Sequence, residues 1–360
     1  MHRNQILLGA LFIFSQSISC EKKATFDQSL FLENYAYNII LPSIDRLIKA
    51  SGHMQNAVVA LNENRNAESL IEAQQAWDKT YSAWIKISLL NFGPGGSEGR
   101  RRILSEEVAL WPVSVNGIEE KIKSEDPELN DSKRNTRGLL AIEYLLFNED
   151  SDDLLKSPQL DNRLNYLVKI VEKLGAQISQ FNKDWQENYL TTFIENYGTA
   201  VKSSTTLMFN EMVRGFEAIR DIKLGIPMGL IAGQSGPQPE LAEARFSRKS
   251  LEYLLTSYTN IVSFWEGKND NEEDGIGWEE YLQSVEGGGE LVKKIHEKFT
   301  KIDSIIERIP VGQNLDELAM SNNTELIELY TELQELTRYF KGESSSLLSL
   351  AITFSSGDGD

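Results

Sequence analysis

Apolar side chains recur every three or four residues through most of the chain, which is the spacing of one helix face. The segment 68–93, ESLIEAQQAWDKTYSAWIKISLLNFG, illustrates the pattern, and its last residue, Gly93, is a stop signal. Its face positions are Leu70, Trp77, Tyr81, Trp84 and Ser88. We interpret the aromatic residues of this face as core packing between helices rather than as a cofactor site.

The same period predicts further long helices. They span residues 160–181, 197–223, 240–265, 277–309 and 323–354. Alternating strand patterns are missing, so the sequence predicts an all-α protein of long antiparallel helices. We expect two helical-bundle halves, residues 29–195 and 196–360, the second with an acidic C-terminal tail. The Gly/Pro-rich stretch 224–239 is either a linker or an ordered loop that covers a site.

The N-terminal residues are typical of a targeting segment. Arg3 precedes the apolar run ILLGALFIF, and the polar residues that follow lead to the only cysteine, Cys20. The run is too short to span a bilayer. It resembles a bacterial lipoprotein signal, which predicts a signal peptide at 1–19, lipidation of Cys20 and a tether at 20–28. The same residues also fit plain secretion with a free thiol.

The formal net charge of −18 argues against nucleic acid as a partner. Apolar residues make up 41% of the chain and charged residues 25%, as in ordinary globular proteins. The acidic loop at 270–281 lacks the twelfth-position glutamate of a calcium loop, because Tyr281 stands there. No zinc-ligand spacing and no Gly-x-Ser-x-Gly motif occurs. The sequence therefore assigns no catalytic residue.

One carboxylate lies within an apolar run, RGLLAIEYLLF (137–147). On a helix, the neighbours of Glu143 on its own face are Leu139, Leu140, Leu146 and Phe147. An unpaired buried carboxylate is costly, so Glu143 must be hydrogen-bonded, ion-paired or protonated. Either a partner on another helix satisfies it and fixes the packing, or it lines a polar pocket between the halves.

An ordered set of short motifs resembles the imelysin family, in its periplasmic lipoprotein branch. The motifs are FGP at 92–94, WP at 111–112, RGLLAIEYLLF at 137–147, KLGIPMG at 223–229, FSRKSL at 246–251 and GIGWEEYL at 275–282. The resemblance covers almost the whole mature chain. It implies two bundle-like halves with a functional site where they meet, and an association with bacterial iron uptake. Some members of the family are described as metallopeptidases.

The family hallmark, Gly-x-His-x-x-Glu, is incomplete here. Gly138 and Glu143 match it, but Leu140 stands at the histidine position. Leucine cannot ligate a metal, so at most Glu143 remains as a metal ligand. The residues that we expect in the cleft are Trp111, Arg137, Gly138, Glu143, Lys223, Ser247 and Ser250. The resemblance implies that Ser247 and Ser250, one helical turn apart, contribute hydroxyls there.

These patterns predict a lipid-anchored protein in the cell envelope of a Gram-negative bacterium, periplasmic or at the outer membrane. The expected membrane contact is through the lipid anchor. We expect the protein to bind a ligand in a cleft between two bundles, and the resemblance favours an iron-related ligand, iron or another divalent metal. Two competing hypotheses are a divergent metallopeptidase and an envelope protein that docks a partner, such as an iron-uptake component.

Overall fold

Helices are the only regular secondary structure in the residues that the structure describes, as predicted. The computed structural model describes residues 26–96, 104–124, 127–130 and 132–354. The predicted signal peptide, Cys20 and most of the tether lie outside these residues, as does the end of the acidic tail. None of the described helices is both long and apolar enough to cross a membrane.

The α-helices are numbered in their order along the chain. Their bounds are α1 Gln28–Asn34, α2 Leu41–Asn64, α3 Ala67–Ile87, α4 Leu104–Val108, α5 Val115–Ile122, α6 Leu139–Phe147, α7 Ser151–Leu155, α8 Leu160–Lys183, α9 Leu190–Glu195, α10 Ser204–Ala218, α11 Ile226–Met228, α12 Ser250–Glu266, α13 Trp278–Gln283, α14 Gly288–Ile306, α15 Leu315–Met320, α16 Thr324–Thr337 and α17 Ser345–Leu347. Four π-helical segments make α1–α2, α8–α9, α10–α11 and α16–α17 continuous. These segments are Tyr35–Ile40, Asp184–Tyr189, Ile219–Gly225 and Arg338–Ser344.

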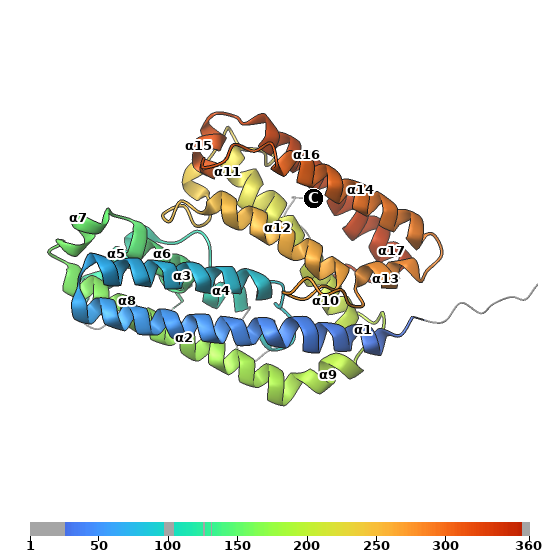
Figure 1. Ribbon diagram of the computed structural model, residues 1–360, viewed down its shortest axis with the longest axis horizontal. Coiled ribbons are helices and arrows are strands. Elements are labelled where there is room, and N and C mark those ends of the chain that lie inside the picture. The colour runs from blue at the N-terminus through green and yellow to red at the C-terminus, as the bar shows by residue number, and fades with distance from the viewer. Residues whose placement is uncertain (1–25, 97–103, 125–126, 131, 355–360) are drawn as a thin grey trace, which may run out of the picture.

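Two groups of long helices lie side by side (Figure 1). In the first half, α2 packs against α3 and α8, and α6 lies on α3. In the second half, α14 packs against α16, while α10 contacts both α12 and α16. The two halves meet where α3 contacts α12. The first helix, α1, contacts α9 and α10, so the start of the chain touches both halves.

The aromatic face of α3 packs in the core, as its spacing predicts. Trp77 and Tyr81 are fully buried and Trp84 nearly so. The Trp77 indole Nε1 donates a hydrogen bond of 2.8 Å to the Leu139 carbonyl at the start of α6. A buried indole N–H needs such a partner, and this one fixes α6 against α3.

Several predicted helices are too long. The predicted helix at 240–265 begins only at Ser250, because Ala244 and Arg248 have φ of 55° and 60°, which no α-helix tolerates. Ser247 therefore lies in a turn before α12, and the expectation that Ser247 and Ser250 are one helical turn apart is wrong. Gly287, with φ of 80°, divides the predicted helix at 277–309 into α13 and α14.

The other bounds shift for local reasons. The helix predicted at 68–93 ends at Ile87. The one predicted from 197 begins at Ser204, where the side chain of Ser203 caps the first turn. The last predicted helix ends at Leu347 instead of 354.

Candidate functional site

The start of α6 requires a glycine. Gly138 has φ of 80°, and a Cβ at this position would lie 2.6 Å from the carbonyl oxygen of Val108 at the end of α4. An L side chain is strained at this φ and clashes at this distance. Gly138 thus lets α6 begin in contact with α4, which sets the position of every later residue of α6.

Arg137, directly before this glycine, is buried against α4. Its Nη2 lies 3.5 Å from Oε2 of Glu107, and its Nη1 donates to the Lys133 carbonyl at 3.3 Å. It does not line the cavity at Glu143. These contacts therefore position α4 and α6, instead of forming the cleft as we expected.

Glu143 is buried, with 1% of its surface exposed, and is satisfied from across the molecule. Its Oε1 accepts the backbone N–H of Ser247 at 2.7 Å and the Ser247 hydroxyl at 2.8 Å. These bonds confirm the prediction that the carboxyl is buried and bonded to a residue distant in sequence. Both donors come from the turn before α12, so Glu143 links the first half to the second.

Burial also changes the acidity of this group. Removal from water raises the pKa of Glu143 to about 7, against the two hydrogen bonds from Ser247, which favour the ionised form. The nearby Glu243 carboxylate raises this pKa further and the Arg245 guanidinium lowers it. Glu143 therefore changes its charge close to neutral pH.

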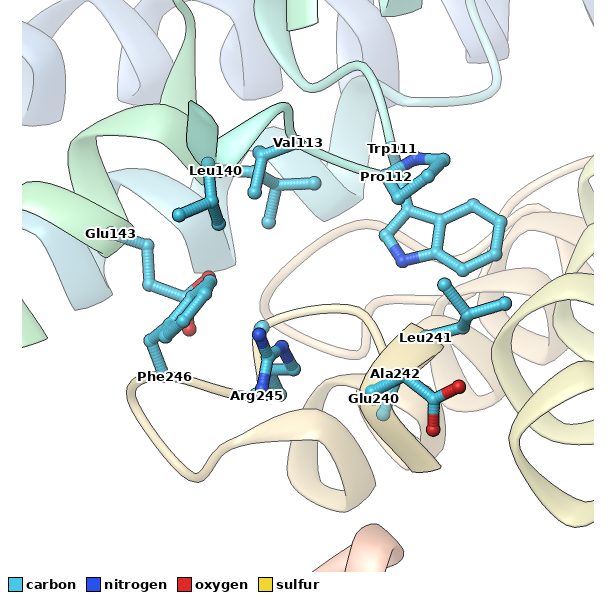
Figure 2. A pocket seen from close by; sticks show the side chains of 12 residues that line it. Trp111, Pro112, Val113, Leu140, Glu143, Glu240, Leu241, Ala242, Arg245 and Phe246 are labelled. Carbon is cyan, nitrogen blue, oxygen red and sulfur yellow. The ribbon is translucent and has the colours of Figure 1, made fainter. Parts of the chain in front are cut away.

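A small cavity of about 90 Å³ lies beside Glu143. Figure 2 shows Leu140 and Glu143 on one side of it, Trp111 and Pro112 across from them, and Arg245 between. Its lining residues are Trp111, Pro112, Val113, Val115, Leu140, Glu143, Glu240, Leu241, Ala242, Ala244, Arg245 and Phe246. The loop after α4, the helix α6 and the turn before α12 thus line one cavity, whose walls carry both polar and apolar side chains.

A larger cavity of about 300 Å³ shares Trp111 with the first. It lies between α3, α10 and α12. Its lining residues are Tyr81, Trp84, Ile85, Ser88, Leu89, Asn91, Ser105, Ala109, Trp111, Glu211, Arg214, Gly215, Ala218, Ile219, Ile222, Lys223, Glu243, Ser257, Asn260 and Ile261. This volume is at the lower end of the range for small-molecule sites.

The structure brings only some of the predicted cleft residues together. Trp111, Glu143 and the turn that holds Ser247 come together around the small cavity. Lys223 lines the larger cavity, where its Nζ pairs with the Glu243 carboxylate. Ser250 is buried at the start of α12 and lines neither cavity.

Sequence reasoning missed most of the lining residues, among them Tyr81 as a wall residue and the charged residues Glu211, Glu243 and Arg245. Glu243 and Arg245 lie in the segment wrongly predicted as helix, which hid their turn positions. Glu211 carried a usable signal, because it lies in the apolar stretch LMFNEMV just as Glu143 lies in its own run.

The donor set around Glu143 does not fit a bound transition metal. Leu140 fills the position one turn before Glu143, and the described residues contain no group of three His, Cys, Asp or Glu side chains able to hold an ion. One carboxylate, already bonded to Ser247, is a poor site for zinc or iron.

Comparison with protein families matches residues 40–339 to imelysin. No curated protein matches the chain. A crystal structure described as an iron-regulated protein A precursor from Parabacteroides distasonis ATCC 8503 is similar, with 18% identity and a TM-score of 0.74, over 91% of this chain and 97% of that one. An imelysin-like protein from Psychrobacter arcticum 273-4 has 15% identity and a TM-score of 0.70 over the same shares. At these identities the likeness shows a common fold.

Proposed function

The chain belongs to the imelysin family, and we propose that this member is a binding protein that holds a small organic ligand beside Trp111, between its two halves. The observation that carries the proposal is the pair of cavities that share the Trp111 side chain. Their walls come from α3 and α6 of the first half and from α10 and α12 of the second. Small-molecule sites combine apolar walls with a few placed polar groups, as these cavities do.

A bare metal ion is not the ligand that we propose. Leu140 offers no lone pair, and the Glu143 carboxylate stands without a second ligand at hallmark spacing. Without a metal-binding set, the metallopeptidase hypothesis has no support in this donor arrangement. The name of the Parabacteroides protein links that relative to iron regulation. We infer that an iron-related cargo would enter this site as an organic iron complex, whose own groups hold the iron.

We further propose that the protein works at the envelope as a lipoprotein attached through Cys20. The support is the sequence pattern alone: a short apolar run followed by polar residues and a single cysteine. The described part of the chain begins at Phe26, whose ring stacks on Tyr281 with centroids 4.6 Å apart. Cys20 precedes Phe26 by six residues, and six residues of extended chain span at most about 20 Å.

A thermal-shift panel tests the binding function. Amines, carboxylates, sugars and ferric citrate are each added to the purified protein, because a ligand that binds only the folded state raises the melting temperature. Ala218→Phe places a ring in the larger cavity and should abolish the shift. Ala232→Phe, on an exposed loop, is the matched control and should retain it. A shift that survives Ala218→Phe would place the ligand elsewhere and contradict the proposal.

A further inference from the structure

The larger cavity contains a second buried carboxylate, on α10. Only 7% of the Glu211 surface is exposed. Burial raises the pKa of Glu211 to about 7, while Arg214 and a hydrogen bond from the Asn91 side chain act in the opposite direction. The hydrogen bonds of Glu143 do not involve this group, because both come from Ser247.

The cation beside Glu211 lies mostly toward solvent. Nη1 of Arg214 is 3.4 Å from Oε1 of Glu211, but the Arg214 side chain is 44% exposed, against 9% for that of Glu211. The Arg214 guanidinium carbon also lies 4.9 Å from the ring centroid of Phe354, which holds it at the rim. Such a half-exposed ion pair contributes little, so within the described part of the chain Glu211 has no strong buried cationic partner.

The other carboxylate in the wall of this cavity, that of Glu243, already has two partners. One carboxylate oxygen of Glu243 accepts a hydrogen bond from the Tyr81 hydroxyl, and the other accepts one from Nζ of Lys223. Burial raises the pKa of Tyr81 well above its usual value, so its hydroxyl remains protonated at neutral pH. The wall residues from α12, Ser257, Asn260 and Ile261, carry no titratable group.

We propose that Glu211 receives the ammonium group of the bound molecule, so that the larger cavity is a site for small organic amines. The proposal rests on the binding function above and names its ligand class. An entering ammonium gives the buried carboxylate a desolvated partner, whereas an entering carboxylate would be repelled. The indole and phenol rings of Trp84, Trp111 and Tyr81 on the wall also favour a cation.

Three probes of one shape and different charge test the ligand class. Benzylammonium, benzyl alcohol and benzoate are titrated into the protein, and their dissociation constants are measured by saturation-transfer NMR. We expect benzylammonium to bind most tightly and benzoate most weakly. Benzylammonium should also bind about tenfold more weakly at pH 6 than at pH 8, because Glu211 is mostly protonated at the lower pH. This pH series needs no variant.

Two isosteric variants separate the roles of neighbouring carboxyls. Glu211→Gln should remove the preference for the amine and its pH dependence. Glu217→Gln is the control, since Glu217 is buried on the same helix, pairs with Lys341 at 2.8 Å and does not line the cavity. The Glu217→Gln protein should bind benzylammonium with the same affinity and the same pH dependence as the wild type.

The outcomes distinguish the two proposals. If benzyl alcohol or benzoate binds at least as tightly as the amine and Ala218→Phe blocks it, the binding function stands and the assignment of amines is wrong. If none of the three probes binds, or if the amine binds equally well at both pH values, the role of Glu211 is also refuted. The binding function is then judged by the wider thermal-shift panel.

Discussion

Replacing Glu143 with glutamine should make the protein more stable at high pH. Its pKa is raised from 4.5 to about 7 in the folded state, so the folded protein holds this proton more tightly than the unfolded chain does. Stability from this group is therefore fully present below about pH 4.5 and is lost as the pH rises through about 7. Glutamine keeps the neutral form at every pH and can still accept from the Ser247 N–H.

The magnitude follows from the two pKa values. A difference of about 2.5 pH units corresponds to about 3 kcal/mol, and the nearly complete burial of Glu143 leaves little solvent screening. As the pH rises from 5 to 8.5, the free energy of unfolding of Glu143→Gln should increase relative to that of the wild type by on the order of 2–3 kcal/mol. Urea unfolding of both proteins across this range measures the difference. The pKa of Glu211 is also raised to about 7, but Glu211 affects the free energy of unfolding of both proteins equally, so its contribution cancels in the difference.

The control is Glu120→Gln, on the exposed face of α5, whose side chain is 68% exposed. Its difference from wild type should change little with pH. If the difference in free energy of unfolding between Glu143→Gln and the wild type is also constant with pH, Glu143 does not change its charge in this range. The Ser247 bonds would then outweigh burial, and the reasoning would be refuted.

Three further changes test other parts of the account. Gly138→Ala should lower the free energy of unfolding by about 2 kcal/mol or more, because φ is positive and a carbonyl oxygen would lie 2.6 Å from the new Cβ. The control Gly342→Ala places its Cβ in open space and should not lower this free energy. Equal effects of the two changes in urea unfolding would contradict the reasoning. Leu140→His should restore a His/Glu pair with Glu143 and tighten zinc binding in calorimetric titration on the order of tenfold. Tight zinc binding by the wild type would show that the site does not need the missing histidine. Cys20→Ser should move the protein from the membrane to the soluble fraction, and a wild type found wholly soluble would remove the lipid anchor.

The helical class was predictable because the apolar period of 3.6 is local. Trp77 and Tyr81 lie on one face of α3 by spacing alone, and that face is in the core. The start of α12 was not predictable in this way, since Ala244 and Arg248 adopt positive φ although neither is a glycine. Their turn presents the Ser247 N–H to a carboxylate 104 residues away, and such a contact exists only in the folded chain.

The candidate site was predictable to a similar extent. A carboxylate within an apolar run indicated that Glu143 is buried, but the identity of its partner depends on how the two halves meet. The same signal at Glu211 was overlooked because no motif drew attention to it. The link between Lys223 and Glu243 joins a π-helical segment to the turn before α12, and sequence spacing carries no information about that approach.

Collisional quenching of Trp111 by acrylamide tests most directly whether a ligand binds between the halves. Of the six tryptophans, the other five are buried, so Trp111 is the indole that acrylamide reaches. A compound that raises the melting temperature should lower the quenchable fraction of the fluorescence, and Trp111→Phe should remove that fraction altogether. Protection of Trp111 that follows the same binding curve as the thermal shift is the result we predict. A ligand that stabilises the protein while Trp111 remains as accessible as before would contradict the account.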